Sequence, residues 1–173
     1  MTKGLEVLTA LPETLDRAQQ ELVLHLTLGP ALLNTRGPAA PEVEHVYVRA
    51  CELGRQVGDT PQLFQALWGL SYSHMAGAKL QTAREVEEEL LGLARQLQNP
   101  VLFVEAHRTL MVPLTWLGEF GLALTHAQHG LALYDPQQMR DHAVRYGQDS
   151  GITCRLFGAV LLWLLGYPDQ SWQ

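Results

Sequence analysis

The chain has 173 residues, a hydrophobic fraction of 47% and a formal net charge of -6 from 18 acidic and 12 basic residues. This length and hydrophobicity predict one globular domain with its own core and exclude a disordered chain. Nucleic acids and anionic membranes are bound by concentrated Lys and Arg, so the dispersed basic residues argue against both as partners.

The first predicted hairpin covers residues 12–58. Its first helix begins near Thr14, and the composition of residues 34–38 predicts the loop that follows. Pro41 suits the first turn of a second helix. An i, i+4, i+7 spacing predicts the buried face of that helix, formed by Val43, Tyr47 and Ala50.

The second predicted hairpin covers residues 61–98. Its first helix begins at Thr60–Pro61, and Gly77–Ala78 form the turn. Residues 80–97 have the most regular helical pattern of the chain, with an inward apolar stripe. The carboxylates of Glu87, Glu88 and Glu89 are expected to face water, because buried carboxylates are rare.

The third predicted hairpin covers residues 100–136, turns at Leu117–Glu119 and ends at Asp135–Pro136. A connection of unusual length, residues 137–151, follows and is expected to form a short helix and a loop. Long loops in compact domains are often functional. A final helix, residues 152–166, and a truncated last repeat, residues 167–173, complete the predicted organisation of a single repeat domain over residues 1–173.

An internal repeat relates these hairpins. The expected turn residues are Pro38, Ala78, Gly118 and Gly166, at intervals of 40, 40 and 48 residues. Small or branched apolar residues stand five positions after the first three turns. We therefore predict an all-α, right-handed superhelix of antiparallel helical hairpins, with about seven helices and a period of about 40 residues.

The pattern resembles tetratricopeptide (TPR) repeats, which place a glycine in the turn, a small residue five positions later and a proline after the second helix. Gly118–Glu119–Phe120 with Ala123 is the best local match. The period exceeds the TPR value of about 34, so the helices are expected to be longer. The Trp-x-x-Leu-Gly pattern typical of the first helix is missing.

Residues 11–171 also resemble a narrower group, the C-terminal repeat region of bacterial proteins that join a class III nucleotide-cyclase-like domain to an AAA-type (STAND-like) ATPase. The similar segments are LPETLDRAQQELVLHLTLGPAL, APEVEHVYVRACELGRQVGDTPQLFQALWGL, KLQTAREVEEELLGLA and WLGEFGLALTHAQHGLALYDPQQ. The resemblance implies a bacterial, cytoplasmic sensor or interaction module in signalling. The chain carries no GxxxxGK[ST] motif, so ATP chemistry is not expected of it.

The leading functional hypothesis is a non-catalytic scaffold that binds protein or peptide, without a cofactor. The first helix of each hairpin would line a groove, with the aromatic rings of Trp68, Tyr72 and Trp116 along it. Its polar contacts would come from His74, His107 and Arg108. The alternative function is a small-molecule sensor with a pocket lined by the same three rings, and a third interpretation places these rings in the core.

The histidines and cysteines form two weaker chemical patterns. His126 and His129 lie three positions apart on one helix and could share a metal ion. A single histidine pair is common, so no metal site is predicted from it. Cys51 and Cys154 are expected to be buried, reduced thiols in a cytosolic protein. No motif supports Cys154 as a nucleophile, and no enzymatic activity is predicted.

The final helix is apolar nearly all round, which predicts an interface. Residues 157–165 form the most apolar run but are too short to span a bilayer. A repeat array needs a polar cap, and this helix offers none. We expect a symmetric homodimer through residues 153–172, with contacts from Phe157, Val160, Leu161, Leu164 and Leu165.

Overall fold

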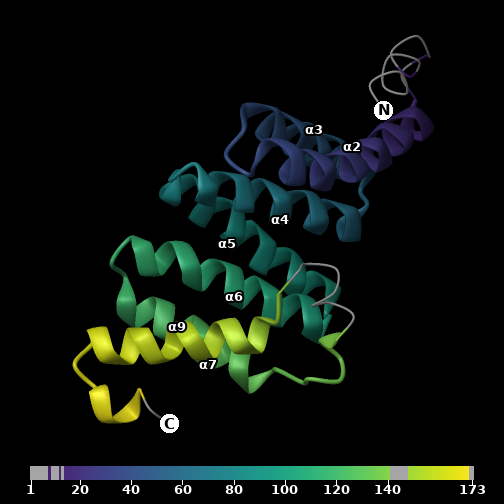
Figure 1. The fold of residues 1–173 in the computed structure, drawn as a ribbon. Helices are drawn as coiled ribbons and strands as arrows, with labels where there is room; N and C mark the ends of the chain where they lie inside the picture. Colours follow the sequence, from purple (N-terminus) through teal and green to yellow (C-terminus); the bar gives the residue numbers. More distant parts are fainter. Residues whose placement is uncertain (1–7, 9–11, 13, 141–147, 172–173) are drawn as a thin grey trace. The chain divides into compact units, whose positions relative to one another are not determined.

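The computed structural model describes residues 8, 12, 14–140 and 148–171. These residues form seven α-helices and one short 3₁₀-helix, and no strand occurs among them (Figure 1). The all-α fold of antiparallel hairpins is thereby confirmed. The elements are α2 (Leu15–Arg36), α3 (Pro41–Val57), α4 (Thr60–Ala76), α5 (Leu80–Leu97), α6 (Pro100–Trp116), α7 (Phe120–Ala132), α9 (Ser150–Leu164) and η1 (Pro168–Gln170).

Side-chain caps begin several of these helices. Thr14 accepts a hydrogen bond from the Arg17 amide at 3.2 Å, which confirms the predicted start of α2. Asp59 caps α4 through the Gln62 amide at 3.0 Å. Each cap pairs an amide that the helix leaves without an intrahelical partner, so the local sequence decides where each helix begins.

The turns within the hairpins have left-handed residues at Gly37, Ala78, Gly118 and Gly166, with φ of 85°, 57°, 81° and 88°. Three of these are the predicted turn residues. The fourth predicted turn residue, Pro38, also lies in its turn, but the left-handed residue there is Gly37, because the proline ring fixes φ near about -65°. Helix α2 extends to Arg36, into the region predicted as a loop.

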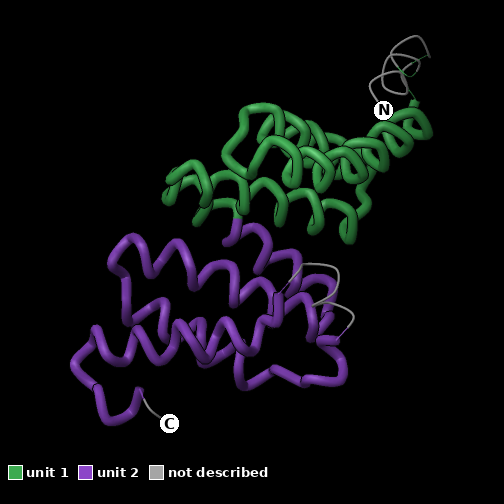
Figure 2. Tube along the Cα trace, in the orientation of Figure 1, with its two compact units in different colours: residues 1–86 green, residues 87–173 purple. Residues whose placement is uncertain are grey.

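The chain divides into two compact units, residues 1–86 and 87–173, with the boundary inside α5 (Figure 2). In the first unit α3 packs against both α2 and α4. The buried Tyr47 ring lies against Gly29 of α2 and Gly69 of α4. A Cβ atom on Gly69 would lie 2.1 Å from the ring, so only glycine allows this approach.

The second unit contains α6, α7 and α9, and α7 packs against both of the others. Its fully buried side chains include Met111, Leu114 and Leu161. Met139, in the predicted connection 137–151, is also buried. The short helix expected in that connection falls partly on residues 141–147, which lie outside the described part of the chain.

One predicted surface residue belongs to the interior. Glu88 and Glu89 are exposed as expected, whereas Glu87 is only 2% exposed. Burial lowers the pKa of Arg108, whereas the charge of Glu105 raises it. The charge of Glu87 also raises the pKa of Arg108, by a smaller amount. In the repeat, position 87 is equivalent to the buried Tyr47 and Ala127, and packing at this position outweighs the general preference of carboxylates for water.

No helix in the described part of the chain is long and apolar enough to cross a membrane.

Candidate protein-binding surface on α9

Helix α9 begins at a side-chain cap. Asp149 accepts hydrogen bonds from the amides of Gly151 and Ile152 at 2.8 and 3.1 Å. Its second carboxylate oxygen accepts a hydrogen bond from the Tyr134 hydroxyl at 2.8 Å. The Tyr134 ring lies against Gly151, where an added Cβ would be 2.5 Å away. These contacts hold the start of α9 against the chain that follows α7.

A buried polar network also holds the start of α9 to α6. Glu105 accepts two hydrogen bonds from Arg108, at 2.9 and 2.6 Å, and one from Ser150 at 2.6 Å. When its amide is oriented to accept, the Gln148 oxygen lies 3.1 Å from both terminal nitrogens of Arg108. Burial alone would lower the pKa of Arg108, but the charge of Glu105 more than offsets this, so the pKa is raised. Arg108 therefore stays charged within the unit.

The inner face of α9 approaches α7 through small residues. A Cβ on Gly130 would lie 3.0 Å from the Cys154 sulfur, and one on Gly158 would lie 3.9 Å from the Ala127 Cβ. Leu161, on the same face, is fully buried. Leu161 was expected in the dimer interface; instead it belongs to the core of its own unit, because the small residues let the two helices pack closely.

The outer face of α9 exposes large apolar side chains. Ile152, Leu156 and Trp163 are 64%, 62% and 64% exposed. Three residues predicted for the interface are also exposed, namely Val160, Leu164 and Leu165, whereas Phe157 is half-buried. Arg155 is the only charged residue between Ser150 and Leu164. This is a contiguous apolar surface of the kind that marks an interaction site.

A groove runs along one side of this surface. It has a volume of about 510 Å³ and lies between α7 and α9, with residues 170 and 171 at one end. Most of its lining is apolar, and the polar lining residues are Gln128, Arg155, Gln170 and Ser171. The apolar lining residues are Leu124, Ala127, Leu131, Leu156, Gly158, Ala159 and Leu162. An apolar groove bordered by a few polar groups suits the side chains of a protein partner.

The polar residues expected to line a groove along the first helices are buried. His74 lies 3.3 Å from Glu44, and His107 lies 2.9 Å from His126. Arg108 is held in the network with Glu105. A groove contact needs an accessible side chain, so the structure assigns His74, His107 and Arg108 to the interior, and their substitution should lower stability.

The aromatic residues proposed for the groove or pocket have different surroundings. Trp68 and Tyr72 stack, with ring centroids 5.7 Å apart. Tyr72 is 46% exposed and Trp116 is 65% exposed. Two rings this accessible do not suit the walls of an enclosed ligand pocket. They also do not belong to the core, which was the other interpretation.

Three histidines gather at the packing of α6 against α7. The His107 ring is 5.0 Å from the His126 ring and 5.2 Å from the His129 ring, measured between centroids. The sequence singled out the pair His126 and His129, but the closest contact joins His126 to His107 instead. Among the residues that the structure describes, no group of three or more His, Cys, Asp or Glu side chains is placed to hold a metal ion.

Both cysteines are buried, as predicted. Burial raises the pKa of the Cys154 thiol to about 11. Cys154 is therefore protonated at neutral pH, which is unfavourable for a nucleophile.

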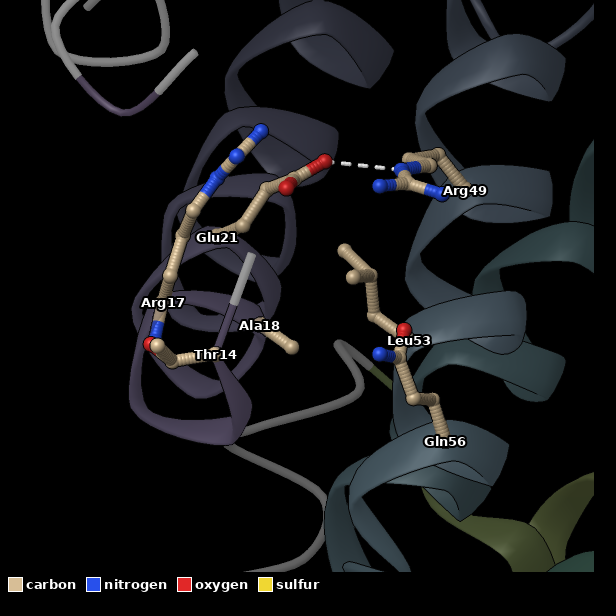
Figure 3. Close-up of a pocket in the computed structure, with 7 residues that line it drawn as sticks. All are labelled: Thr14, Arg17, Ala18, Glu21, Arg49, Leu53 and Gln56. Carbon is tan, nitrogen blue, oxygen red and sulfur yellow. Dashed lines mark hydrogen bonds and ion pairs between the residues drawn. The ribbon is translucent and has the colours of Figure 1, made fainter. Parts of the chain in front are cut away.

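A smaller polar pocket lies between α2 and α3 in the first unit (Figure 3). Its volume is about 200 Å³, and Arg17, Glu21, Arg49 and Gln56 contribute polar groups. Arg49 donates to Glu21 at 2.7 Å, and this hydrogen bond is the main reason that the pKa of Glu21 is lowered. The lining charges therefore largely satisfy one another, and the pocket shows little demand for a charged ligand.

Sequence reasoning missed the network of Glu105, Arg108 and Ser150. One signal was present, because Glu105 and Arg108 lie three positions apart in a helix that is otherwise strongly apolar. Ser150 gave no such signal, since its contact with Glu105 joins residues 45 positions apart.

Solved structures with the same fold include TPR proteins. The TPR domain of Arabidopsis FLU is 22% identical, with a TM-score of 0.61, and the match covers 66% of this chain and 95% of that one. The apo form of RapI is 9% identical, with a TM-score of 0.78 over 96% of this chain, which spans only 56% of RapI. No family model and no curated protein sequence matches the chain. At these identities the likeness concerns the fold, which is an all-α, TPR-like arrangement of helical hairpins.

Proposed function

We propose that the chain is a non-catalytic scaffold that binds protein partners, and that α9 with the groove beside α7 is its binding surface. The observation that carries this proposal is the exposed apolar face of α9, which includes Ile152, Leu156, Val160 and Trp163. Helical-repeat folds generally bind partners on their extended surfaces, which supports the proposal.

We further propose that one partner is a second copy of the chain, bound through α9 in a symmetric dimer. The net charge of -6 makes most of the surface of one copy repel another. The segment Ser150–Leu164 has no carboxylate and only one cation, Arg155. Two copies could therefore meet at α9 without bringing like charges of the acidic surface together.

Light scattering coupled to size exclusion tests the dimer. The natural chain is expected to be a dimer. The Val160→Glu, Trp163→Glu variant is expected to be a folded monomer, because dimerisation would bury its two new carboxylates in the interface. Leu122→Glu is the matched control, since Leu122 on α7 is 42% exposed, close to Val160 at 44%, but lies outside α9 and the groove. A natural chain that stays monomeric at high concentration would contradict the dimer.

The cellular setting that the sequence resemblance implies is also a proposal. We infer a cytoplasmic role in bacterial signalling from the similarity of residues 11–171 to repeat regions of cyclase–ATPase proteins. Sequencing the DNA on both sides of the region that encodes this chain tests the inference. The inference predicts a nucleotide-cyclase-like or AAA-type ATPase region in the same protein or in a neighbouring one.

The alternative function is a small-molecule sensor. It predicts that a metabolite raises the Tm of the natural chain and that Trp68→Ala abolishes this rise.

A further inference from the structure

Two imidazole rings meet where α6 packs against α7. The Nδ1 atoms of His107 and His126 are 2.9 Å apart, which is a hydrogen-bond distance. His107 is buried, and His126 is half-buried. Phe103 covers another side of His107, with the ring centroids 5.0 Å apart. This contact therefore belongs to the packing between the two helices.

The hydrogen bond has a strict proton requirement. One Nδ1 must donate and the other must accept, so the two atoms share a single proton between them. If both rings were protonated, two donors and two positive charges would face one another across 2.9 Å. A partly buried contact cannot accommodate that arrangement, because neither charge is fully solvated.

The groups around the pair decide how it responds to acid. His129 of α7 and Arg95 of α5 add positive charge that disfavours protonation of both rings, whereas Glu88 of α5 favours protonation of His126. On the side of α9, Cys154 packs against Gly130 and is a neutral thiol. Most of the neighbouring charge therefore favours the neutral pair.

We propose that the His107–His126 pair is an acid-sensitive latch that fastens α7 to α6, and that its protonation releases α7 and loosens the support of α9. The transmission rests on contacts already described, since α7 carries Ala127 and Gly130 against the inner face of α9. The consequence for partner binding, a weaker dimer in acid, depends on the function proposed above. The release of α7 does not depend on it.

The direction of the pH effect follows from the two states. Burial, His126, His129 and Arg95 together lower the pKa of His107 to about 4, and burial, His129 and Arg95 lower that of His126. In the unfolded chain the pKa values of both histidines return to about 6.5. Below this pH the unfolded state therefore binds more protons than the folded state, until the folded histidines are protonated as well. The contribution of the histidine pair to stability is thus fully present above pH 6.5 and is lost as the pH falls toward 4. For His107 alone, the opening equilibrium at pH 5 rises about 30-fold.

Two measurements on the full chain test the latch. NMR titration of the histidine rings should place the pKa values of His107 and His126 below the ordinary value of about 6.5. Amide hydrogen exchange in α7, corrected for intrinsic rates, should show an opening at least about 30-fold more frequent at pH 5.0 than at pH 7.5. In a His107→Asn, His126→Asn variant most of that increase should disappear, because an amide group takes the place of each Nδ1 without titrating.

His45→Asn is the control and should leave the pH response of α7 unchanged. Titration of His107 and His126 near the ordinary histidine value of about 6.5 would overturn the proposal, even if the double variant did not fold. An unchanged pH response in a folded double variant would overturn it equally. Failure of the dimer to form at pH 7.5 would count against the proposed function alone, since the ring titration and the exchange in α7 are measured on the monomer as well.

Discussion

At the scale of single residues, glycines act in opposite ways at different positions. Gly69→Ala should lower the free energy of unfolding by about 1–3 kcal/mol, because the new Cβ would overlap the Tyr47 ring. Gly92→Ala in α5 is the matched control, since nothing lies within 4 Å of its Cβ position. That change should stabilise by up to about 1 kcal/mol through helix propensity. Urea denaturation of both variants checks the contrast, and equal effects would contradict the tight fit around Tyr47.

The buried ion pair of the second unit gives a further residue-scale prediction. Glu105→Ala leaves the charge of Arg108 buried without its carboxylate, so the free energy of unfolding should fall by about 3–5 kcal/mol. A Glu105→Leu, Arg108→Met, Ser150→Ala variant removes all three polar groups and should recover most of the loss. Urea denaturation of the two variants separates them. If the triple variant were no more stable than Glu105→Ala, the cost would come from lost packing rather than from the stranded charge.

At the scale of elements, the start of α9 depends on one side chain. Asp149→Ala removes the acceptor of two helix amides and should cost about 0.5–2 kcal/mol. Asp149→Asn keeps an oxygen at that position and should retain most of the stability. Hydrogen exchange of the first amides of α9 provides the measurement, with faster exchange expected in the alanine variant. Equal exchange in both variants would mean that the packing of the Tyr134 ring on Gly151 and the hydrogen bond from Ser150 to Glu105 suffice to hold this end.

At the scale of the whole molecule, the division into two units predicts independent responses to mutation. Gly69 belongs to the unit of residues 1–86 and Glu105 to that of residues 87–173. Gly69 lies against Tyr47, whereas Glu105 is hydrogen-bonded to Arg108 and Ser150, so the losses from Gly69→Ala and Glu105→Ala should add within about 0.5 kcal/mol. A double-mutant cycle in urea measures this. A larger coupling energy would support the single domain predicted from the sequence over two separable units.

The helices, their starts and the hairpin repeat could be predicted from the sequence, because these depend on neighbours within a few positions. Thr14 caps the amide three residues away, and Gly118 adopts the conformation that its turn requires. The helical spacing of apolar residues likewise predicted the buried faces of the helices, except at Glu87, which was expected to face water and is buried. The apolar character of α9 was also evident from the sequence.

The accessibility of the polar residues and the exposed face of α9 could not be predicted from the sequence, because both depend on how the helices pack. His107 meets His126 at a distance of 19 positions, and Glu105 meets Ser150 at 45. Contacts over such separations depend on how helices pack, which local spacing does not specify. Leu161 and Val160 are adjacent in an apolar run, yet Leu161 is buried and Val160 is exposed. The reason is that small residues on α7 allow close packing against only one side of α9.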